Sequence, residues 1–178
     1  MTGMSGKLAD LLVYRQWFGR TVVAKKPRPI SSMSDKQQAV RDKFKLGAAY
    51  ARTAIADSAT QAIYKAKTTP GQTPFNMALA DYFTMPVIGD IDVSGYTGKV
   101  GDKIKVQATD DFMVKSVDVS IAHADGTLLE QGAAVADPDG VHWLYTATVA
   151  NAALSGSKIT VTAKDLPANA TVGDKVMP

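Results

Sequence analysis

The hydrophobic and polar positions along the chain predict a β arm within the first thirty residues. Two strand-prone runs, Leu8–Tyr14 and Thr21–Ala24, flank a tip at Arg15–Arg20, where Gly19 can supply the positive φ of a short hairpin loop. Alternation along the first run places apolar side chains on both faces of the strand, which therefore needs cover on both faces. Because an isolated two-stranded hairpin is marginal in water, we expect the arm to pack against another surface.

The arm also supplies the residues that we predict for an assembly interface. Trp17 and Phe18 are large aromatic side chains at the hairpin tip, and such side chains each bury on the order of 150–250 Å² when covered. They either fold back on the chain's own helices or fill a pocket on another subunit, as interface anchors do. The predicted interface consists of Leu11, Leu12, Val13, Tyr14, Arg15, Trp17, Phe18 and Arg20.

A helical pattern follows the proline-containing connector Lys25–Pro29. Ser34 and Gln37 have the spacing of a capping box, which predicts the start of a helix of about twenty residues that ends near residue 56 or 57. Positions at helical spacing predict a single apolar stripe on this helix. The stripe consists of Val40, Phe44, Gly47, Ala48, Ala51 and Ile55.

Two shorter helices are expected after the long one. Ser58 is a candidate N-cap for the second helix, and Thr73 followed by Pro74 has the pattern of an N-cap and a first helical residue. Pro86 marks the end of the third helix. The three helices carry few large apolar side chains, so we expect the arm, a second domain or a neighbouring subunit to complete their core.

From about residue 87 the pattern changes to short β-prone runs separated by turn sequences such as Asp125-Gly126. Trp143 and Tyr145 lie on one face of one run and are expected to be core aromatics. Seven strands in about ninety residues are typical of a small antiparallel β-sandwich. The runs are Ile88–Asp92, Lys103–Ala108, Val114–Ala122, Thr127–Ala133, Val141–Val149, Lys158–Ala163 and Thr171–Val176.

Composition narrows the classes of function. The 178 residues include no cysteine, which excludes disulfides, thiolate metal ligands and a cysteine nucleophile. No run approaches the roughly 18 apolar residues of a membrane span. The first residues also lack the apolar core and cleavage site of a secretory signal, so we expect a protein used in the cytoplasm or exported by another route.

The net charge of +3 conceals two oppositely charged halves. Residues 1–86 carry +8, from 13 Lys or Arg against 5 Asp or Glu, and residues 87–178 carry −5, from 7 against 12. A basic half can bind nucleic acid, or it can meet the acidic half of the next subunit. We favour contact between subunits, because the basic residues are interleaved with the β arm.

Two groups of residues resemble known families. The segments Gly101–Asp111, Val114–Ile121, Trp143–Val149 and Ile159–Asp165 resemble a bacterial immunoglobulin-like module, a class used as spacers and adhesive units on cell surfaces and in phage particles. The first half is similar to short uncharacterised proteins of Bacteroidota and their phages, through residues such as Gly6-Lys-Leu and Gly19-Arg-Thr-Val. The resemblance implies a structural or adhesive role and transfers no catalytic residue. Antibody-type domains carry a pair of cysteines that forms a core disulfide, and this chain contains no cysteine.

The candidate catalytic residues do not form a recognisable pattern. His123 and His142 are the two histidines, and a hydrolase would need one of them beside an activated serine and a carboxylate. No serine lies in the Gly-x-Ser-x-Gly motif that places a nucleophilic serine in hydrolases, and the sequence Ser155-Gly-Ser157 is typical of a loop. We therefore predict that the protein is not an enzyme.

Aspartates are frequent in the predicted loops of the C-terminal half, and oxygen ligands from several loops can hold Ca²⁺. Aspartate is also a preferred turn residue, and no stretch has the full ligand spacing of an EF-hand. We therefore expect no cofactor and no dedicated calcium requirement. The aspartates considered are Asp110, Asp111, Asp125, Asp137 and Asp139.

Nucleic-acid binding is an alternative function for the arm. Its basic side chains could contact phosphates while its aromatic side chains stack on bases. No recognised nucleic-acid motif surrounds them, so binding to nucleic acid is possible but not favoured. The residues concerned are Tyr14, Arg15, Trp17, Arg20, Lys25, Lys26 and Arg28.

Together these observations predict an α+β protein with a β-hairpin arm and connector at 1–30, a helical region at 31–86 and an immunoglobulin-like antiparallel β-sandwich at 87–178. The predicted function is a non-enzymatic assembly protein that forms a homo-oligomer or polymer by adding the arm of one subunit to the next. The expected setting is a phage virion, in the capsid or tail with other virion proteins as possible partners, or an assembly in the bacterial cytoplasm. The alternatives are a cell-surface adhesion or filament module and a nucleic-acid-associated protein.

Overall fold

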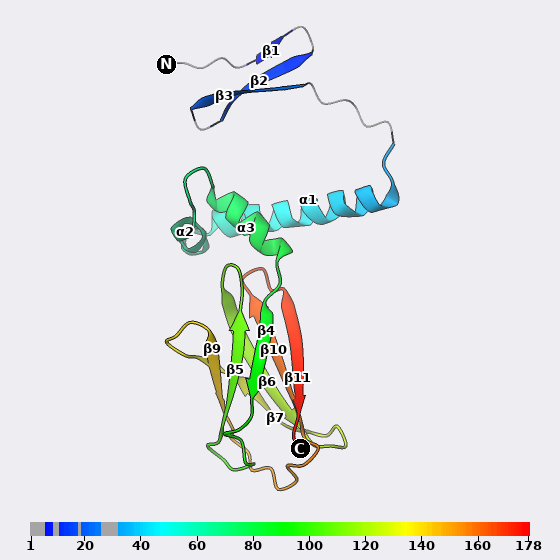
Figure 1. Ribbon diagram of the computed structural model, residues 1–178, viewed down its shortest axis with the longest axis vertical. Coiled ribbons are helices and arrows are strands. Elements are labelled where there is room, and N and C mark those ends of the chain that lie inside the picture. Colours follow the sequence, from blue (N-terminus) through cyan, green and yellow to red (C-terminus); the bar gives the residue numbers. More distant parts are fainter. Residues whose placement is uncertain (1–5, 9–10, 18, 26–31) are drawn as a thin grey trace.

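The computed structural model describes residues 6–8, 11–17, 19–25 and 32–178. Within these residues, three helices and three antiparallel sheets make the chain an α+β protein, as predicted. Figure 1 shows the parts in order along the long axis of the molecule, with a small N-terminal sheet at one end, the helices next, and two larger sheets at the other end.

The arm is a three-stranded antiparallel sheet. Its strands β1 (Gly6–Leu8), β2 (Leu12–Trp17) and β3 (Arg20–Lys25) follow one another in the order β1-β2-β3. The turn between β2 and β3 contains Gly19, whose φ of +76° is the left-handed conformation predicted for it. Phe18, which precedes Gly19 in the sequence, lies outside the described residues.

The helices begin at the caps that the sequence encodes. Helix α1 (Asp35–Ala56) starts with a capping box, in which the Ser34 hydroxyl accepts the Gln37 N–H and the Gln37 side chain accepts the Ser34 N–H at 3.0 Å. Helix α3 (Pro74–Phe83) starts with Thr73 as its N-cap and proline in its first turn. Both predictions are confirmed.

Helix α2 (Ser58–Ala66) begins one residue earlier than predicted. Its N-cap is Asp57, whose carboxylate accepts the Thr60 N–H at 2.8 Å, and Ser58 is the first helical residue. Aspartate and serine are comparable as N-caps, so residue type alone does not decide between adjacent candidates.

The helical core is small and is completed from the C-terminal half. Tyr64 is fully buried among Ala51, Ala54 and Ala78. Phe112, which follows β5, packs against the Tyr64 ring with 4.5 Å between ring centroids. The predicted need for outside cover is therefore met in part by the C-terminal half of the chain.

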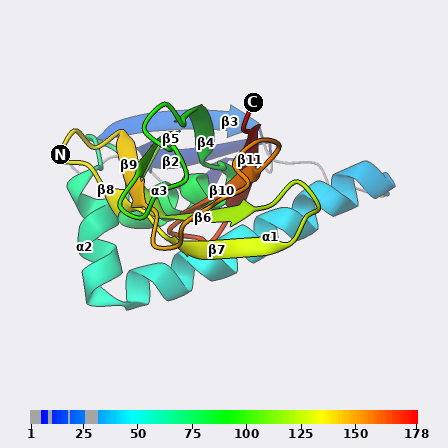
Figure 2. The ribbon, with the colours of Figure 1, turned by 90° about the horizontal axis from the view of Figure 1, so that it is seen from below.

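Two four-stranded antiparallel sheets pack face to face and form the C-terminal sandwich. In Figure 2, β4, β5 and β9 of one sheet lie on one side, and β6 and β7 of the other sheet lie on the opposite side. The first sheet has the order β4-β5-β9-β8, with bounds Val87–Asp92, Lys103–Thr109, His142–Thr146 and Val135–Ala136. The second has the order β11-β10-β6-β7, with bounds Ala170–Val176, Lys158–Asp165, Val114–Ala122 and Leu128–Ala133. All seven predicted strands are present. Strand β8 was not predicted because it contains only two residues.

The core of the C-terminal sandwich follows the alternation of its strands. In β6, Val117, Val119 and Ile121 are fully buried, while the residues between them are partly exposed. Tyr145 is buried in the same core, and Trp143 packs against it while remaining partly exposed. The prediction that these two aromatics belong to the core is confirmed.

Candidate functional site

The arm carries all of the residues predicted for the assembly interface. Leu11 precedes β2, Arg20 is the first residue of β3, and Phe18 lies outside the described residues. The cross-strand pair Tyr14 and Val23 lies on one face of the sheet, and the pair Arg15 and Val22 on the other. The remaining predicted residues lie within β2 and are Leu12, Val13 and Trp17.

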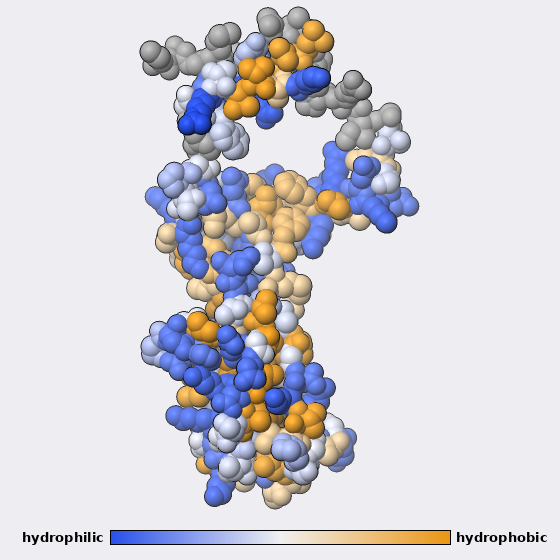
Figure 3. All heavy atoms as spheres, viewed as in Figure 1, coloured by the Kyte–Doolittle hydropathy of each residue, from blue (hydrophilic) through white to orange (hydrophobic). Residues whose placement is uncertain are grey.

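The arm exposes apolar side chains at the end of the molecule, as Figure 3 shows. Leu11 is 70% exposed and Trp17 is 62% exposed. Val22 and Val23 of β3 are also exposed. Among the described residues, none of the three arm strands packs extensively on the helices or on the C-terminal sandwich. The predicted interface omitted Val22 and Val23, although the strand-prone run Thr21–Ala24 contains them.

The predicted strand Leu8–Tyr14 was wrong. Leu11 lies in a turn between β1 and β2, so the run reverses direction and pairs with itself. Asp10, a residue type that favours turns, interrupts the apolar run in the sequence, but its structure lies outside the described residues. As a result β2 is the central strand, and the described sheet has two edge strands, the three-residue β1 and the six-residue β3.

The first half of α1 also differs from its prediction. Val40 and Phe44 were expected to face the core, but they are 70% and 52% exposed. The short helix α3 reaches α1 at Gly47, where an added Cβ would lie 2.9 Å from the Tyr82 ring. The positions N-terminal to Gly47 therefore extend beyond the cover of α3, although Phe44 still stacks on Phe83 with 6.4 Å between ring centroids.

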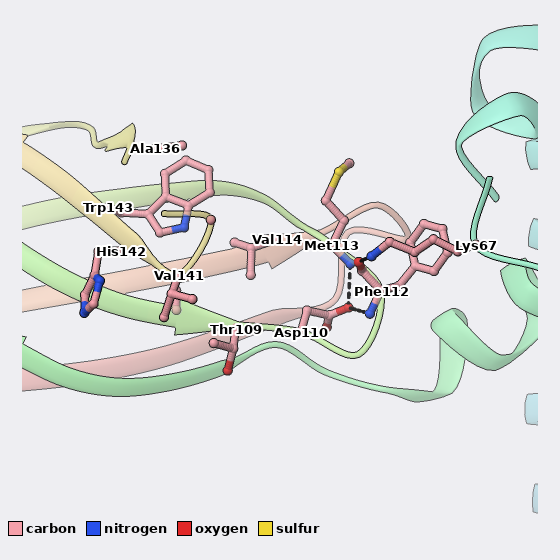
Figure 4. Close-up of a pocket in the computed structure, with 12 residues that line it drawn as sticks. Lys67, Thr109, Asp110, Phe112, Met113, Val114, Ala136, Val141, His142 and Trp143 are labelled. Atoms are coloured by element: carbon pink, nitrogen blue, oxygen red, sulfur yellow. Dashed lines mark hydrogen bonds between the residues drawn. The ribbon is translucent and has the colours of Figure 1, made fainter. Parts of the chain in front are cut away.

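A cavity of about 490 Å³ lies where the C-terminal sandwich meets the helices, as shown in Figure 4. Its walls include Phe112, Val141 and Trp143. Lys67 of the α2–α3 connection reaches its edge, where the ammonium group donates a hydrogen bond to the Phe112 carbonyl and lies 4.6 Å from the Phe112 ring centroid. The cavity is mainly apolar. Its lysine, Lys67, already donates a hydrogen bond to the Phe112 carbonyl, and this bond joins the helices to the C-terminal sandwich.

The histidines lie apart from any arrangement that resembles a triad. His123 lines a shallow pocket with Asp125 and Ser155, but its Nδ1 is buried without a hydrogen-bond partner. His142 instead pairs through Nδ1 with the Asp139 carboxylate. Within the described residues, no hydrogen bond links a histidine to both a serine and a carboxylate, as that chemistry requires.

Three of the loop aspartates fulfil the turn role expected of them. The Asp125 carboxylate accepts the Thr127 N–H at 2.8 Å, and Asp110 accepts the backbone N–H groups of the two residues after Asp111. Asp139 likewise accepts the backbone N–H groups of residues 141 and 142. The hydrogen bond from the His142 side chain, together with these backbone bonds, lowers the pKa of Asp139.

Comparison with known proteins adds little to this description. No protein-family model and no curated protein matches the sequence. One similar solved structure is the crystal structure of an engineered protein, with 19% sequence identity and a TM-score of 0.38. The matched region covers 58% of this chain and 25% of that chain, so this chain spans about a quarter of the other's length. Among the helices described here, none is both long and apolar enough to cross a membrane.

Proposed function

We propose that this chain is a non-enzymatic assembly protein that joins copies of itself through its N-terminal arm. The observation that carries the proposal is the open edge of β3, in a sheet that exposes the side chains of Leu11, Trp17, Val22 and Val23. An open sheet edge offers unpaired backbone groups to an additional strand. The six residues of β3 extend over about 20 Å, which is enough to cross most of a small domain.

Charge supports a second copy of the chain as the partner. The arm and helices carry +8, whereas residues 87–178 carry −5, so the N-terminal part of one copy is complementary to the C-terminal sandwich of the next. Contact between unlike parts of successive copies is heterologous, and it generates rings or open polymers. The proposed product is therefore a ring or a filament.

The proposed setting is a virion component with an immunoglobulin-like C-terminal domain. The strand orders β4-β5-β9-β8 and β11-β10-β6-β7 support this domain type, because they correspond to the A-B-E-D and G-F-C-C′ sheets of immunoglobulin domains. The virion setting itself rests on the sequence resemblance to modules of phage particles. A cell-surface adhesion or filament module is the alternative with the same domain type.

Replacing the two aromatic residues at the arm tip tests the proposed interface. Truncating a central aromatic anchor commonly costs about 2 kcal/mol of binding energy, so Trp17→Ala combined with Phe18→Ala should raise the concentration needed for assembly by about 30-fold. Light scattering over a concentration series measures this change. Phe44→Ala is the matched control, because it removes an exposed aromatic ring from α1. If Phe44→Ala lost assembly and the arm variant did not, the interface would lie on α1 and not on the arm.

Nucleic-acid binding is the alternative function that the basic side chains of the arm suggest. Phosphate contacts release counterions, so such binding would weaken steeply as salt is raised. We expect at most weak, sequence-independent binding near physiological salt, measured by fluorescence anisotropy with labelled DNA and RNA. Arg15→Ala with Arg20→Ala provides the comparison. Submicromolar affinity that this double variant abolishes would establish the rival function.

A further inference from the structure

Three carboxylates from distant parts of the sequence meet where the helices join the C-terminal sandwich. Asp81 belongs to α3, Asp110 follows β5 in one sheet, and Asp165 ends β10 in the other sheet. One oxygen from each lies within 4.8 Å of the others. Asp81 is 3% exposed and Asp165 is 1% exposed, whereas Asp110 is half-buried, so two of the three carboxylates lie inside the protein.

Part of this cluster is fixed by hydrogen bonds. The Tyr64 hydroxyl donates to Asp81 Oδ2 at 2.6 Å. The Asn169 side chain donates to Asp165 Oδ2 and its backbone N–H donates to Asp165 Oδ1, both at 2.7 Å. Asp110 Oδ1 accepts two backbone N–H groups. The carboxylates are therefore held near one another by their own partners.

Two oxygens of the cluster have no such partner. Asp81 Oδ1 and Asp110 Oδ2 are buried, and neither accepts a hydrogen bond from the described residues. A buried carboxylate oxygen without a partner is costly, and neighbouring carboxylates increase the cost by mutual repulsion. These two oxygens therefore point to a positively charged species between the carboxylates.

The balance of charge around the three carboxylates also favours a bound cation. Lys67 is a cation beside the cluster, but its ammonium group is bonded to the Phe112 carbonyl. Three carboxylates facing one lysine leave an excess of negative charge that a divalent ion would balance.

We propose that Asp81, Asp110 and Asp165 bind a hard divalent cation, Ca²⁺ in preference to Mg²⁺, at the junction between α3 and both sheets of the C-terminal sandwich. Carboxylate oxygens are the ligands that such cations prefer. Ca²⁺ accepts irregular coordination, whereas Mg²⁺ demands a near-ideal octahedron. Here Asp110 and Asp165 are oriented by their own hydrogen bonds, which favours the more tolerant ion.

This proposal departs from the expectation of no calcium requirement, which was based on the loop aspartates. Asp81 lies in a helix and Asp165 ends a strand, so the spacing of turn residues could not reveal them. A cation bound here would tie the helical region to both sheets.

The test uses the full chain, stripped with chelator and then titrated with Ca²⁺ or Mg²⁺ alone. We expect Ca²⁺ to raise the melting temperature, because an ion that binds the native state stabilises it, and Mg²⁺ to raise it less. Calorimetric titration should give one Ca²⁺ per chain. Removing a ligand should weaken binding at least as much as losing an outer-shell partner, that is, by about tenfold or more in Asp81→Asn and Asp110→Asn.

Asp174→Asn is the matched control, because it removes the same charge from an exposed aspartate that pairs with Lys158 at 3.3 Å. The control should respond to Ca²⁺ like the wild type. If an asparagine variant fails to fold, Tb³⁺ luminescence of the wild type replaces it, since Tyr64 lies beside the site and should sensitise emission that Ca²⁺ quenches by displacement.

Three outcomes would overturn the proposal. An unchanged wild-type melting temperature without binding heat would mean that the cluster holds a proton and not a metal ion. An equal Ca²⁺ response in Asp81→Asn and the wild type would place the ion elsewhere on the acidic surface. An equal response to Mg²⁺ would contradict the preference for Ca²⁺.

Discussion

Deletion of residues 1–28 is expected to leave a folded chain that no longer assembles. The deletion removes all three arm strands, including the open edge of β3 and the exposed side chains of Leu11 and Trp17. The helical core and the C-terminal sandwich should survive, because their buried clusters contain no residue of the arm. Light scattering at matched concentrations should give the monomer mass for the truncated chain and a larger mass for the full chain.

The controls for this deletion address folding and the alternative position of the arm. Circular dichroism should show the same cooperative unfolding of the C-terminal sandwich in both chains. A truncated chain that retains the full oligomer mass would show that the arm is not the connector. A monomeric wild type whose arm resists protease would show that the arm packs on its own chain.

Replacing Glu130 by alanine should lower the free energy of unfolding of the C-terminal sandwich by about 3 kcal/mol. Glu130 lies in β7 and is 7% exposed. Its Oε2 accepts the Thr148 N–H at 2.8 Å, the Thr148 hydroxyl at 2.7 Å and the Val149 N–H at 3.2 Å. The carboxylate thus joins one sheet to the segment after β9 in the other, and its removal takes away the acceptor of all three hydrogen bonds.

Two variants make the Glu130 experiment specific. Glu130→Gln keeps an acceptor oxygen and should cost less than Glu130→Ala in denaturant unfolding followed by circular dichroism. Gln131→Ala alters the exposed neighbour in β7 and should change the stability by no more than about 0.5 kcal/mol. If Glu130→Ala matched Gln131→Ala, these hydrogen bonds would contribute nothing measurable to the stability of the C-terminal sandwich.

The sequence determined the features that depend on neighbouring residues. The capping box of Ser34 and Gln37 marked the start of α1, and Thr73 marked the start of α3. The alternation of Val117, Val119 and Ile121 identified the buried face of β6. These features could be read from the chain because hydrogen bonds over three residues and the two-residue period of a strand are local.

Tertiary structure decided which apolar surfaces are covered and which polar groups meet. The stripe on α1 is uncovered at Val40 because α3 packs at Gly47, and helical periodicity does not reveal the length or position of the packing helix. The first run of the arm pairs with itself, which makes β2 the central strand and leaves β3 as the longer of the two edge strands. Asp81, Asp110 and Asp165 approach one another only because α3 docks where β5 and β10 end. Such contacts join residues far apart in sequence, so their positions depend on how whole elements pack.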